Sequence, residues 1–268
     1  MLGIPRTCCF LLPLLPLLAC QSQPHASLPE AQLLVMSYNI HHGEGVDGVF
    51  DLQRIAEVIK AENPVLVALQ EVDSGTTRAG GVAQDTQLAA LTGMYSVVFG
   101  EAIPYAGGSY GDAVLSRWPL VESRTIALGA SPQHEKRVAV VVVVEEPTTG
   151  RQLRFVGTHL DHTTDPADRI RQAQQLNQAL LPATMPTLLV GDLNAQPDSQ
   201  PMQVFFAAGW QAADVTLQPT FPSTQANIKI DWFLRAPGQR DRLTQVQVLS
   251  APLASDHCPL IATWIVGR

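Results

Sequence analysis

An aspartate and a histidine stand side by side near the C-terminus, in Ser255-Asp256-His257. The apolar run at 260–266 that follows predicts a strand, so the pair lies at the start of a strand. A histidine next to a carboxylate can move a proton and help to bind a cation. Adjacent Asp and His residues are common by chance, so the significance of this pair depends on polar residues at the ends of other strands.

A second motif, Gly191-Asp192-Leu193-Asn194, follows the apolar run at 187–190. Alternation along an extended segment would place Asp192 and Asn194 on one side, and Gly191 allows a close backbone approach. One carboxylate and one amide so placed can hold a water, a phosphoryl oxygen or a metal. An ordinary Asx turn is the alternative interpretation.

Two further polar residues end buried runs in the N-terminal half. Glu71 follows the apolar residues 65–69, and Asn39 lies near the end of the run at 33–40. A carboxylate at the rim of a buried strand is costly unless it is paired, and a hard divalent cation is a natural partner. The amide oxygen of Asn39 could bind the same ion or orient Glu71. A surface glutamate and a turn asparagine are the alternatives.

Asp231 stands among apolar residues in the predicted strand 228–234, so it needs a polar partner. His257 is the obvious one, because an Asp–His pair fixes the tautomer and leaves the other ring nitrogen free to take a proton from water. His159 ends the strand 153–159, and Arg137 opens a strand with five consecutive valines. Both can bind phosphate oxygens, although a structural histidine and a surface arginine fit the sequence equally well.

Together these residues predict metal-assisted attack of water on phosphorus. No Gly-x-Ser-x-Gly elbow joins a predicted strand to a predicted helix, there is no P-loop and no Cys/His zinc spacing, and Cys258 has no environment that would lower its pKa. A serine or cysteine nucleophile is therefore disfavoured. Four histidines lack a strand-end setting and are expected at the surface or behind the catalytic groups: His41, His42, His134 and His162.

The apolar pattern predicts strands joined partly by helices and partly by hairpins. Strands are expected at 33–40, 65–69, 94–100, 112–117, after Pro119, and at 137–145, 153–159, 187–190, 228–234, 244–249 and 260–266. Helices are expected after Asp51 up to Asn63-Pro64, and at 84–91, 165–181 and 200–208, with loops at 72–83 and 103–111. The valine strand and 153–159 should form a hairpin. This mixed order favours sheets with helices outside.

The N-terminus has the composition of an export signal. Residues 10–19 are apolar but too few to span a bilayer, and Leu17-Leu18-Ala19-Cys20 resembles a bacterial lipobox. We therefore expect a signal peptide at 1–20 with a lipidated Cys20 that anchors the protein to a membrane, a tether at 21–30, and one domain at 31–268. Plain secretion is the alternative. Cys258 would then have no disulfide partner within the mature domain.

The set of motifs resembles the endonuclease/exonuclease/phosphatase superfamily, the DNase I-like metal-dependent phosphoesterases, in an exported bacterial form. The resemblance covers residues 33–267 and is carried by six short motifs in the family's order: 36–40 with Asn39, Gln70-Glu71, Thr158-His159, 191–194, Ile230-Asp231 and 255–257. It implies a four-layer α/β sandwich, in which two packed mixed β-sheets are flanked by helices. It also implies Mg²⁺, or Mn²⁺, at the ends of the strands.

The resemblance also implies a role for each matched residue. Glu71 would be the main metal ligand, assisted by Asn39 and Asp256. Asp231 would orient His257, the general base, and His159 and Asn194 would bind the scissile phosphate. Asp192 would position or activate the water, and the roles of Asp192 and His257 could be exchanged. Asp112 departs from the pattern, because the family often has Asn there, and its role is left open.

The expected activity is hydrolysis of a phosphodiester outside the cytoplasm, without a protein partner. A net charge of −7 and the lack of a Lys/Arg cluster disfavour nonspecific binding to duplex nucleic acid. A phospholipid headgroup or a small phosphodiester is therefore the favoured substrate. An extracellular nuclease, a phosphomonoesterase and a noncatalytic lipid- or protein-binding lipoprotein are the alternatives.

Overall fold

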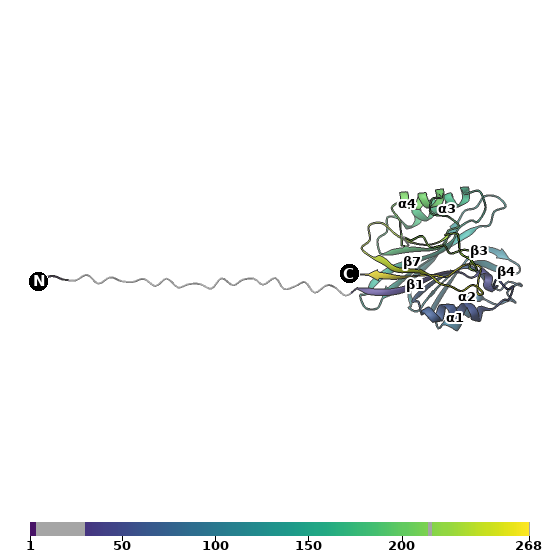
Figure 1. Cartoon of the computed structure of the whole chain (residues 1–268), viewed down its shortest axis with the longest axis horizontal. Helices are drawn as coiled ribbons and strands as arrows, with labels where there is room; N and C mark the ends of the chain where they lie inside the picture. Colours follow the sequence, from purple (N-terminus) through teal and green to yellow (C-terminus); the bar gives the residue numbers. More distant parts are fainter. Residues whose placement is uncertain (4–29, 214–215, 268) are drawn as a thin grey trace.

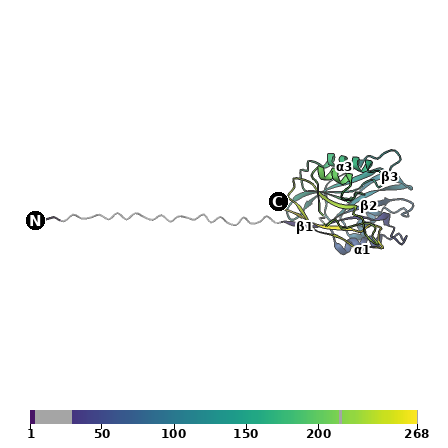
Figure 2. The same ribbon diagram turned by 45° about the horizontal axis from the view of Figure 1, so that its top comes forward.

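The computed structural model describes residues 1–3, 30–213 and 216–267. Within them, twelve strands form two six-stranded mixed sheets that pack face to face with helices outside (Figures 1 and 2). The predicted four-layer α/β sandwich is confirmed. The predicted signal peptide, lipobox and tether fall almost entirely within residues 4–29 and so lie outside the described residues.

Each sheet combines parallel and antiparallel neighbours. The first has the order β11 (Arg242–Val248), β12 (Leu260–Val266), β1 (Ala31–Asn39), β2 (Leu66–Ser74), β4 (Gly108–Ser116), β3 (Ser96–Tyr105). The second has the order β5 (Leu120–Leu128), β6 (Arg137–Glu146), β7 (Arg151–His159), β8 (Thr187–Asp192), β10 (Asp231–Arg235), β9 (Gln211–Ala212). The predicted hairpin of the valine strand is formed by β6 and β7.

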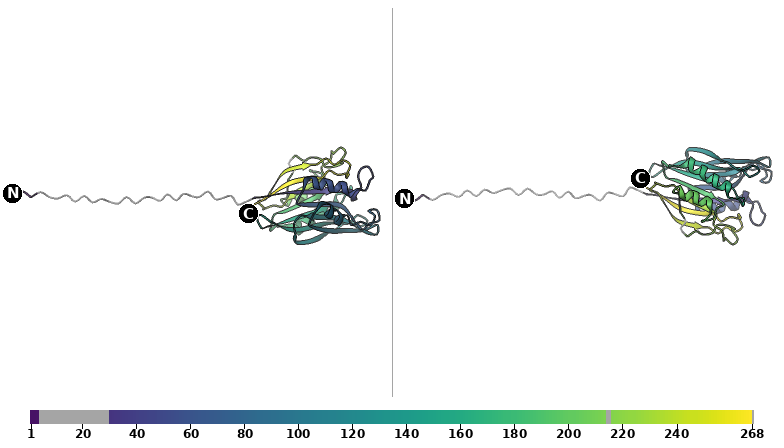
Figure 3. Two further views of the ribbon diagram at one scale, coloured as in Figure 1. Left: turned by 90° about the horizontal axis from the view of Figure 1, so that it is seen from below. Right: turned by 90° about the horizontal axis from the view of Figure 1, so that it is seen from above.

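Two pairs of helices cover the outer faces of the sheets. Helices α1 (Leu52–Glu62) and α2 (Gln84–Thr92) pack on the first sheet, and α3 (Ala167–Leu180) and α4 (Gln200–Ala207) on the second (Figure 3). Asp51 accepts hydrogen bonds from the backbone of Gln53 and Arg54, and α1 ends before Asn63, as the sequence predicts. Asn63 itself has a left-handed conformation. None of the described helices is long and apolar enough to cross a membrane.

The central apolar layer lies between the two sheets. On β6, Val140, Val142 and Val144 point into this layer, while Val141 faces the helices. The sheets approach closely, since a Cβ placed on Gly157 would lie 2.9 Å from the Cβ of Ala68 in the opposite sheet. Such dry packing leaves polar side chains only the strand ends as a place to gather.

Strand register brings those ends together. β1 and β2 are parallel with Asn39 beside Gln70, and β7 and β8 are parallel with His159 beside Asp192. Asp231, the first residue of the antiparallel β10, pairs with Asp192 on the other side. Both parallel pairs are joined by helical crossovers, so the carboxyl ends of these four strands face the same edge of the molecule.

Two predicted loops near this edge are wrong in part. β2 continues to Ser74 after a bulge at Glu71, where a flexible loop was expected from residue 72. The predicted loop at 103–111 is the tip of the β3–β4 hairpin, with a turn at Ala106-Gly107 where both φ values are positive. A bulge lets pairing with β4 resume beyond Glu71, so the strand does not end where its apolar run ends. β10 begins at Asp231, and Ile228 instead pairs with Phe221 in an isolated bridge.

Candidate active site

The strand ends surround a cleft of about 400 Å³. Seven of the nine predicted site residues line it: Glu71, Arg137, His159, Asp192, Asn194, Asp256 and His257. The other two, Asn39 and Asp231, are buried directly behind it and hydrogen-bond to lining residues. Glu71 and His257, which come from separate segments of the chain, share this cleft, so the predicted residues meet at one site.

A histidine between two carboxylates forms one wall. His257 Nδ1 lies 3.0 Å from Asp231 Oδ2, and its Nε2 lies 3.5 Å from Asp192 Oδ2. Burial alone would lower the pKa of His257, but the two carboxylates outweigh it and raise this pKa to about 10. Burial and the charge of Asp231 raise the pKa of Asp192 to about 7. The imidazole is therefore cationic here, while Asp192 is the group that can exchange a proton near neutral pH.

Asn39 connects this wall to Glu71. Its Nδ2 donates to Glu71 Oε1 at 3.0 Å and to Asp192 Oδ2 at 3.2 Å, and its Oδ1 accepts from the His41 backbone at 3.0 Å. Burial would raise the pKa of Glu71, but its contacts with His42 and Asn39 help to hold this pKa well below the usual range. Glu71 occupies the bulge of β2 with a φ of 58°, which turns its carboxylate into the cleft.

The opposite wall carries donors for an anion. Arg137 Nη1 lies 3.2 Å from His159 Nδ1, and Asn194 Nδ2 lies 2.9 Å from His159 Nε2. Burial and the charge of Arg137 hold the pKa of His159 well below its usual range, so its imidazole is neutral. Arg137 is 4% exposed, and the alternative of a surface arginine is wrong.

The Asp192–Asn194 motif is positioned by a turn. The Asn194 backbone donates to Asp192 Oδ1 at 2.9 Å with a φ of 47°, so the Asx turn occurs, and both side chains still face the cleft. Asp192 and Asn194 therefore share one side because Asn194 has a left-handed backbone conformation, and not because of the strand alternation that the sequence predicted. The predicted close approach at Gly191 is confirmed, because a Cβ there would lie 1.8 Å from the Thr158 carbonyl oxygen.

Five residues that line the cleft were not predicted as site residues: Tyr110, Glu135, His162, Phe221 and Ile230. Glu135 and His162 contact the Arg137 guanidinium at 2.8 and 2.9 Å, Tyr110 lines the same wall, and His42 lies behind Glu71. His162 follows His159 by three residues, a spacing that could have indicated it. Tyr110 was assigned to a loop, and nothing in the sequence around Glu135 points to the site.

Asp112, the departure from the family pattern, is buried on β4 and 3% exposed. Burial raises its pKa well above the usual range, and the nearby charge of Arg137 only partly opposes this. This shift favours the protonated form of the Asp112 carboxyl group. A protonated carboxyl group resembles a neutral amide, so it fits a position at which the family often has asparagine.

Comparison with known proteins agrees with this geometry. Residues 36–257 match the Endonuclease/Exonuclease/phosphatase family over most of the chain. The chain belongs to this family. Its members are phosphoester hydrolases that include nucleases and phosphatases, so the protein is an enzyme of that class. The family is typically dependent on divalent metals, and clusters of acidic and histidine side chains of the required kind are present.

Individual relatives are distant but cover nearly the whole domain. The Escherichia coli protein YbhP is 25% identical over 246 residues, which span 85% of this chain and 94% of YbhP. An endonuclease/exonuclease/phosphatase from Beutenbergia cavernae is 25% identical with a TM-score of 0.76, covering 88% of this chain and 72% of its own. The mannosyl-6-phosphatase Bt3783 of Bacteroides thetaiotaomicron shares the fold at 18% identity with a TM-score of 0.72, covering 87% and 100%.

The raised pKa of Asp112 gives a testable pH dependence of stability. Above a pH of about 4 the unfolded state loses the Asp112 proton, while the folded state keeps it. The folded state then binds more protons, so Asp112 makes the protein less stable as pH rises toward the folded-state pKa. Asp112→Asn should remove this contribution, so the stability of the variant relative to the wild type should rise as the pH increases above about 4. Urea denaturation across this range measures it, with the exposed Asp198→Asn as control. A flat difference for Asp112→Asn would contradict the assignment.

Proposed function

We propose that this enzyme is a Mg²⁺-dependent phosphodiesterase that acts outside the cytoplasm on a phospholipid headgroup or another small phosphodiester. One observation carries the proposal: oxygen ligands for a cation, donors for an anion and a proton acceptor line the same cleft. This combination matches what hydrolysis of a phosphoester by water requires.

The donor set on one side fits a hard divalent cation. Glu71, Asn39 and Asp256 offer two carboxylates and one amide, and oxygen ligands of this kind suit Mg²⁺ or Mn²⁺. In this structure the Asn39 amide orients Glu71 through its nitrogen, and it would bind the ion through Oδ1 only by exchanging its hydrogen bonds with Glu71, Asp192 and the His41 backbone. When bound, the cation would neutralise charge on the phosphoryl oxygens.

Asp192 is the residue that we assign to accept the proton of the attacking water. Its pKa of about 7 suits a general base, whereas His257 is held in its cationic form by Asp231 and Asp192. These protonation states favour Asp192 over His257 as the general base, an exchange of roles that the sequence leaves open. His257 then stabilises the negative charge that develops on the phosphorus oxygens, and Asp231 keeps the imidazole oriented.

The anion-binding wall favours a diester. Among the described residues that line the cleft, Arg137 is the one arginine, and Glu135 lies 2.8 Å from its guanidinium. His159 is neutral, so it contributes a hydrogen bond without a full charge. A phosphodiester carries one negative charge and a monoester up to two, so a weakly cationic wall supports the diester. The side cleft of about 170 Å³ beside Tyr105 and Tyr110 has room for a small alcohol group.

Removal of the base and a panel of substrates test the reaction together. Asp192→Asn keeps the shape of the side chain and should lower kcat by roughly 10²–10⁴-fold, since it removes general-base catalysis. Glycerophosphodiesters, labelled DNA, a phosphomonoester and a chromogenic phosphodiester should be compared, with the exposed Glu57→Gln as control. Fastest turnover of the headgroup diesters supports the proposal. Preference for DNA indicates a nuclease, preference for the monoester a phosphatase, and binding without turnover a noncatalytic lipoprotein.

Metal dependence has a readout that needs no substrate. A ligand present at 100 times its Kd stabilises the folded state by about 2.7 kcal/mol, which for a domain of this size raises Tm by roughly 5 °C or more. Mg²⁺ or Mn²⁺ should therefore raise the Tm of the wild type, and EDTA should reverse the effect. Glu71→Gln should lose most of this shift. An equal shift in both proteins would rule out Glu71 as the main ligand.

The location outside the cytoplasm rests on the N-terminal sequence. We propose that residues 1–20 are an export signal, that Cys20 is lipidated and anchors the enzyme to a membrane, and that residues 21–30 form a tether to the domain. An anchored enzyme would meet phospholipid headgroups at high local concentration. Mass spectrometry of the membrane fraction should find a lipid on Cys20, and Cys20→Ser should release the protein. An unmodified Cys20 in a soluble protein would indicate plain secretion.

A further inference from the structure

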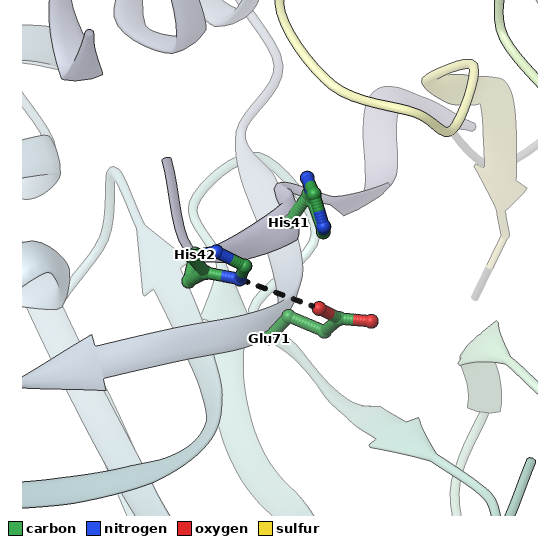
Figure 4. A group of neighbouring side chains, drawn as sticks. All are labelled: His41, His42 and Glu71. Carbon is green, nitrogen blue, oxygen red and sulfur yellow. Dashed lines mark ion pairs between the residues drawn. The ribbon is translucent and has the colours of Figure 1, made fainter. Parts of the chain in front are cut away.

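Three clusters of histidine and carboxylate side chains occur in the part of the chain that the structure describes. One is the wall formed by Asp192, Asp231 and His257. The second consists of His134, Asp161 and Asp168. Its Asp168 carboxylate already has protein partners, because it accepts hydrogen bonds from the backbone and the hydroxyl of Ser131 and lies 2.7 Å from His134 Nδ1. In the third, formed by His41, His42 and Glu71, one ring nitrogen, His42 Nδ1, has no hydrogen-bond partner (Figure 4).

One residue, Glu44, fixes the outer nitrogens of both histidines. His41 Nδ1 lies 3.0 Å from the Glu44 carbonyl oxygen, which can only accept, so Nδ1 carries the hydrogen. His42 Nε2 lies 3.4 Å from the Glu44 carboxylate and donates to it in the same way. In neutral rings the remaining nitrogens, His41 Nε2 and His42 Nδ1, then carry lone pairs. A histidine that ligates a metal typically has this outer hydrogen bond to a carbonyl or a carboxylate.

The inner side of the cluster lacks a donor when the His42 ring is neutral and carries its hydrogen on Nε2. His42 Nδ1 is buried without a hydrogen-bond partner and lies 3.8 Å from Glu71 Oε2, the contact drawn as a dashed line in Figure 4. Two electron-rich atoms that face each other in a buried position repel unless a positive charge lies between them. A proton on Nδ1 would give a long ion pair, and a metal ion would bind both atoms.

The backbone holds the three residues in place at some cost. His41, His42 and Glu71 all have positive φ, at 45°, 43° and 58°. Such conformations are unfavourable for residues other than glycine and persist only where the surroundings impose them. Here Gln84 donates to the His42 carbonyl at 2.6 Å and Asn39 accepts from the His41 backbone. The result is that the ligand atoms of all three side chains lie within 4.8 Å of one another.

We propose that His41, His42 and Glu71 form a second cation site, selective for a transition metal such as Zn²⁺ or Mn²⁺. It shares Glu71 with the oxygen-ligand site of the proposed function and rests on that proposal only for this shared residue. Two imidazole nitrogens and one carboxylate suit borderline metals, whereas Mg²⁺ prefers oxygen ligands. Ligand atoms of one zinc ion are roughly 3.4 Å apart, so small side-chain rotations would close the cluster. Three protein ligands leave a position open for water or a substrate oxygen.

Binding of Co²⁺, a spectroscopic substitute for zinc, in the presence of saturating Mg²⁺ tests this site. Mg²⁺ occupies the oxygen-ligand site, so the wild type should bind one Co²⁺ per chain and show visible absorption bands of an imidazole-bound ion. His41→Asn and His42→Asn should each weaken Co²⁺ binding at least tenfold. Asparagine is chosen because it tolerates positive φ better than alanine does, and circular dichroism checks that the variants fold.

The matched control is His162→Asn, which removes an imidazole from the same cleft outside the cluster and should leave Co²⁺ binding unchanged. Glu44→Ala, which removes the outer hydrogen bond of His42, should weaken Co²⁺ binding roughly tenfold. Co²⁺ binding that is absent in Mg²⁺, or that is equal in wild type and His42→Asn, would overturn the proposal and leave His42 as an ion-pair partner of Glu71. Because the readout is binding, it remains informative even if no phosphodiester is hydrolysed.

Discussion

The site depends on one buried carboxylate that joins the two sheets. Asp192, at the end of β8 in the second sheet, accepts a hydrogen bond from Asn39, at the end of β1 in the first. It is 1% exposed and also lies within 3.5 Å of His159 and His257. A buried carboxylate needs several partners, so the partners of Asp192 hold the strand ends in a fixed arrangement. The cleft therefore follows from satisfying this one side chain.

Compensation of buried charge explains the rest of the cleft. Glu71, Asp112, Asp192 and Asp231 gather at one edge, with Arg137 and a protonated His257 as the opposing cations. The remaining negative charge favours a divalent cation at Glu71 and a proton on Asp112. The opposite wall retains donors that can receive an anion. One edge of the sandwich thus has a side suited to a metal and a side suited to a phosphate.

The sequence allowed most of the fold and the identity of the central residues to be predicted. Apolar runs such as the valines of β6 mark strands because a buried strand must be apolar on both faces. Polar residues that end these runs, such as Asn39 and His159, were predicted at the site because strand ends are where a buried sheet meets solvent. The predicted strand boundaries were wrong where the backbone departs from regular geometry, although Glu71 was correctly predicted at the site. Glu71 sits in a bulge, and the hairpin that carries Tyr110 resembled a loop because its Gly and Tyr residues lack a clear alternation.

By itself, the sequence determined which residue types are available and which strands place them at an end, and this was sufficient for the fold class and for the general class of phosphoester hydrolase. Only the tertiary structure decided the protonation of those residues and their neighbours across the sheets. His257 becomes a cation because Asp192 and Asp231 flank it, and His42 reaches Glu71 because consecutive left-handed residues turn the chain after β1. Both effects depend on distances between residues far apart in the chain. Local patterns of polarity do not specify such distances, because these are fixed only when the two sheets pack.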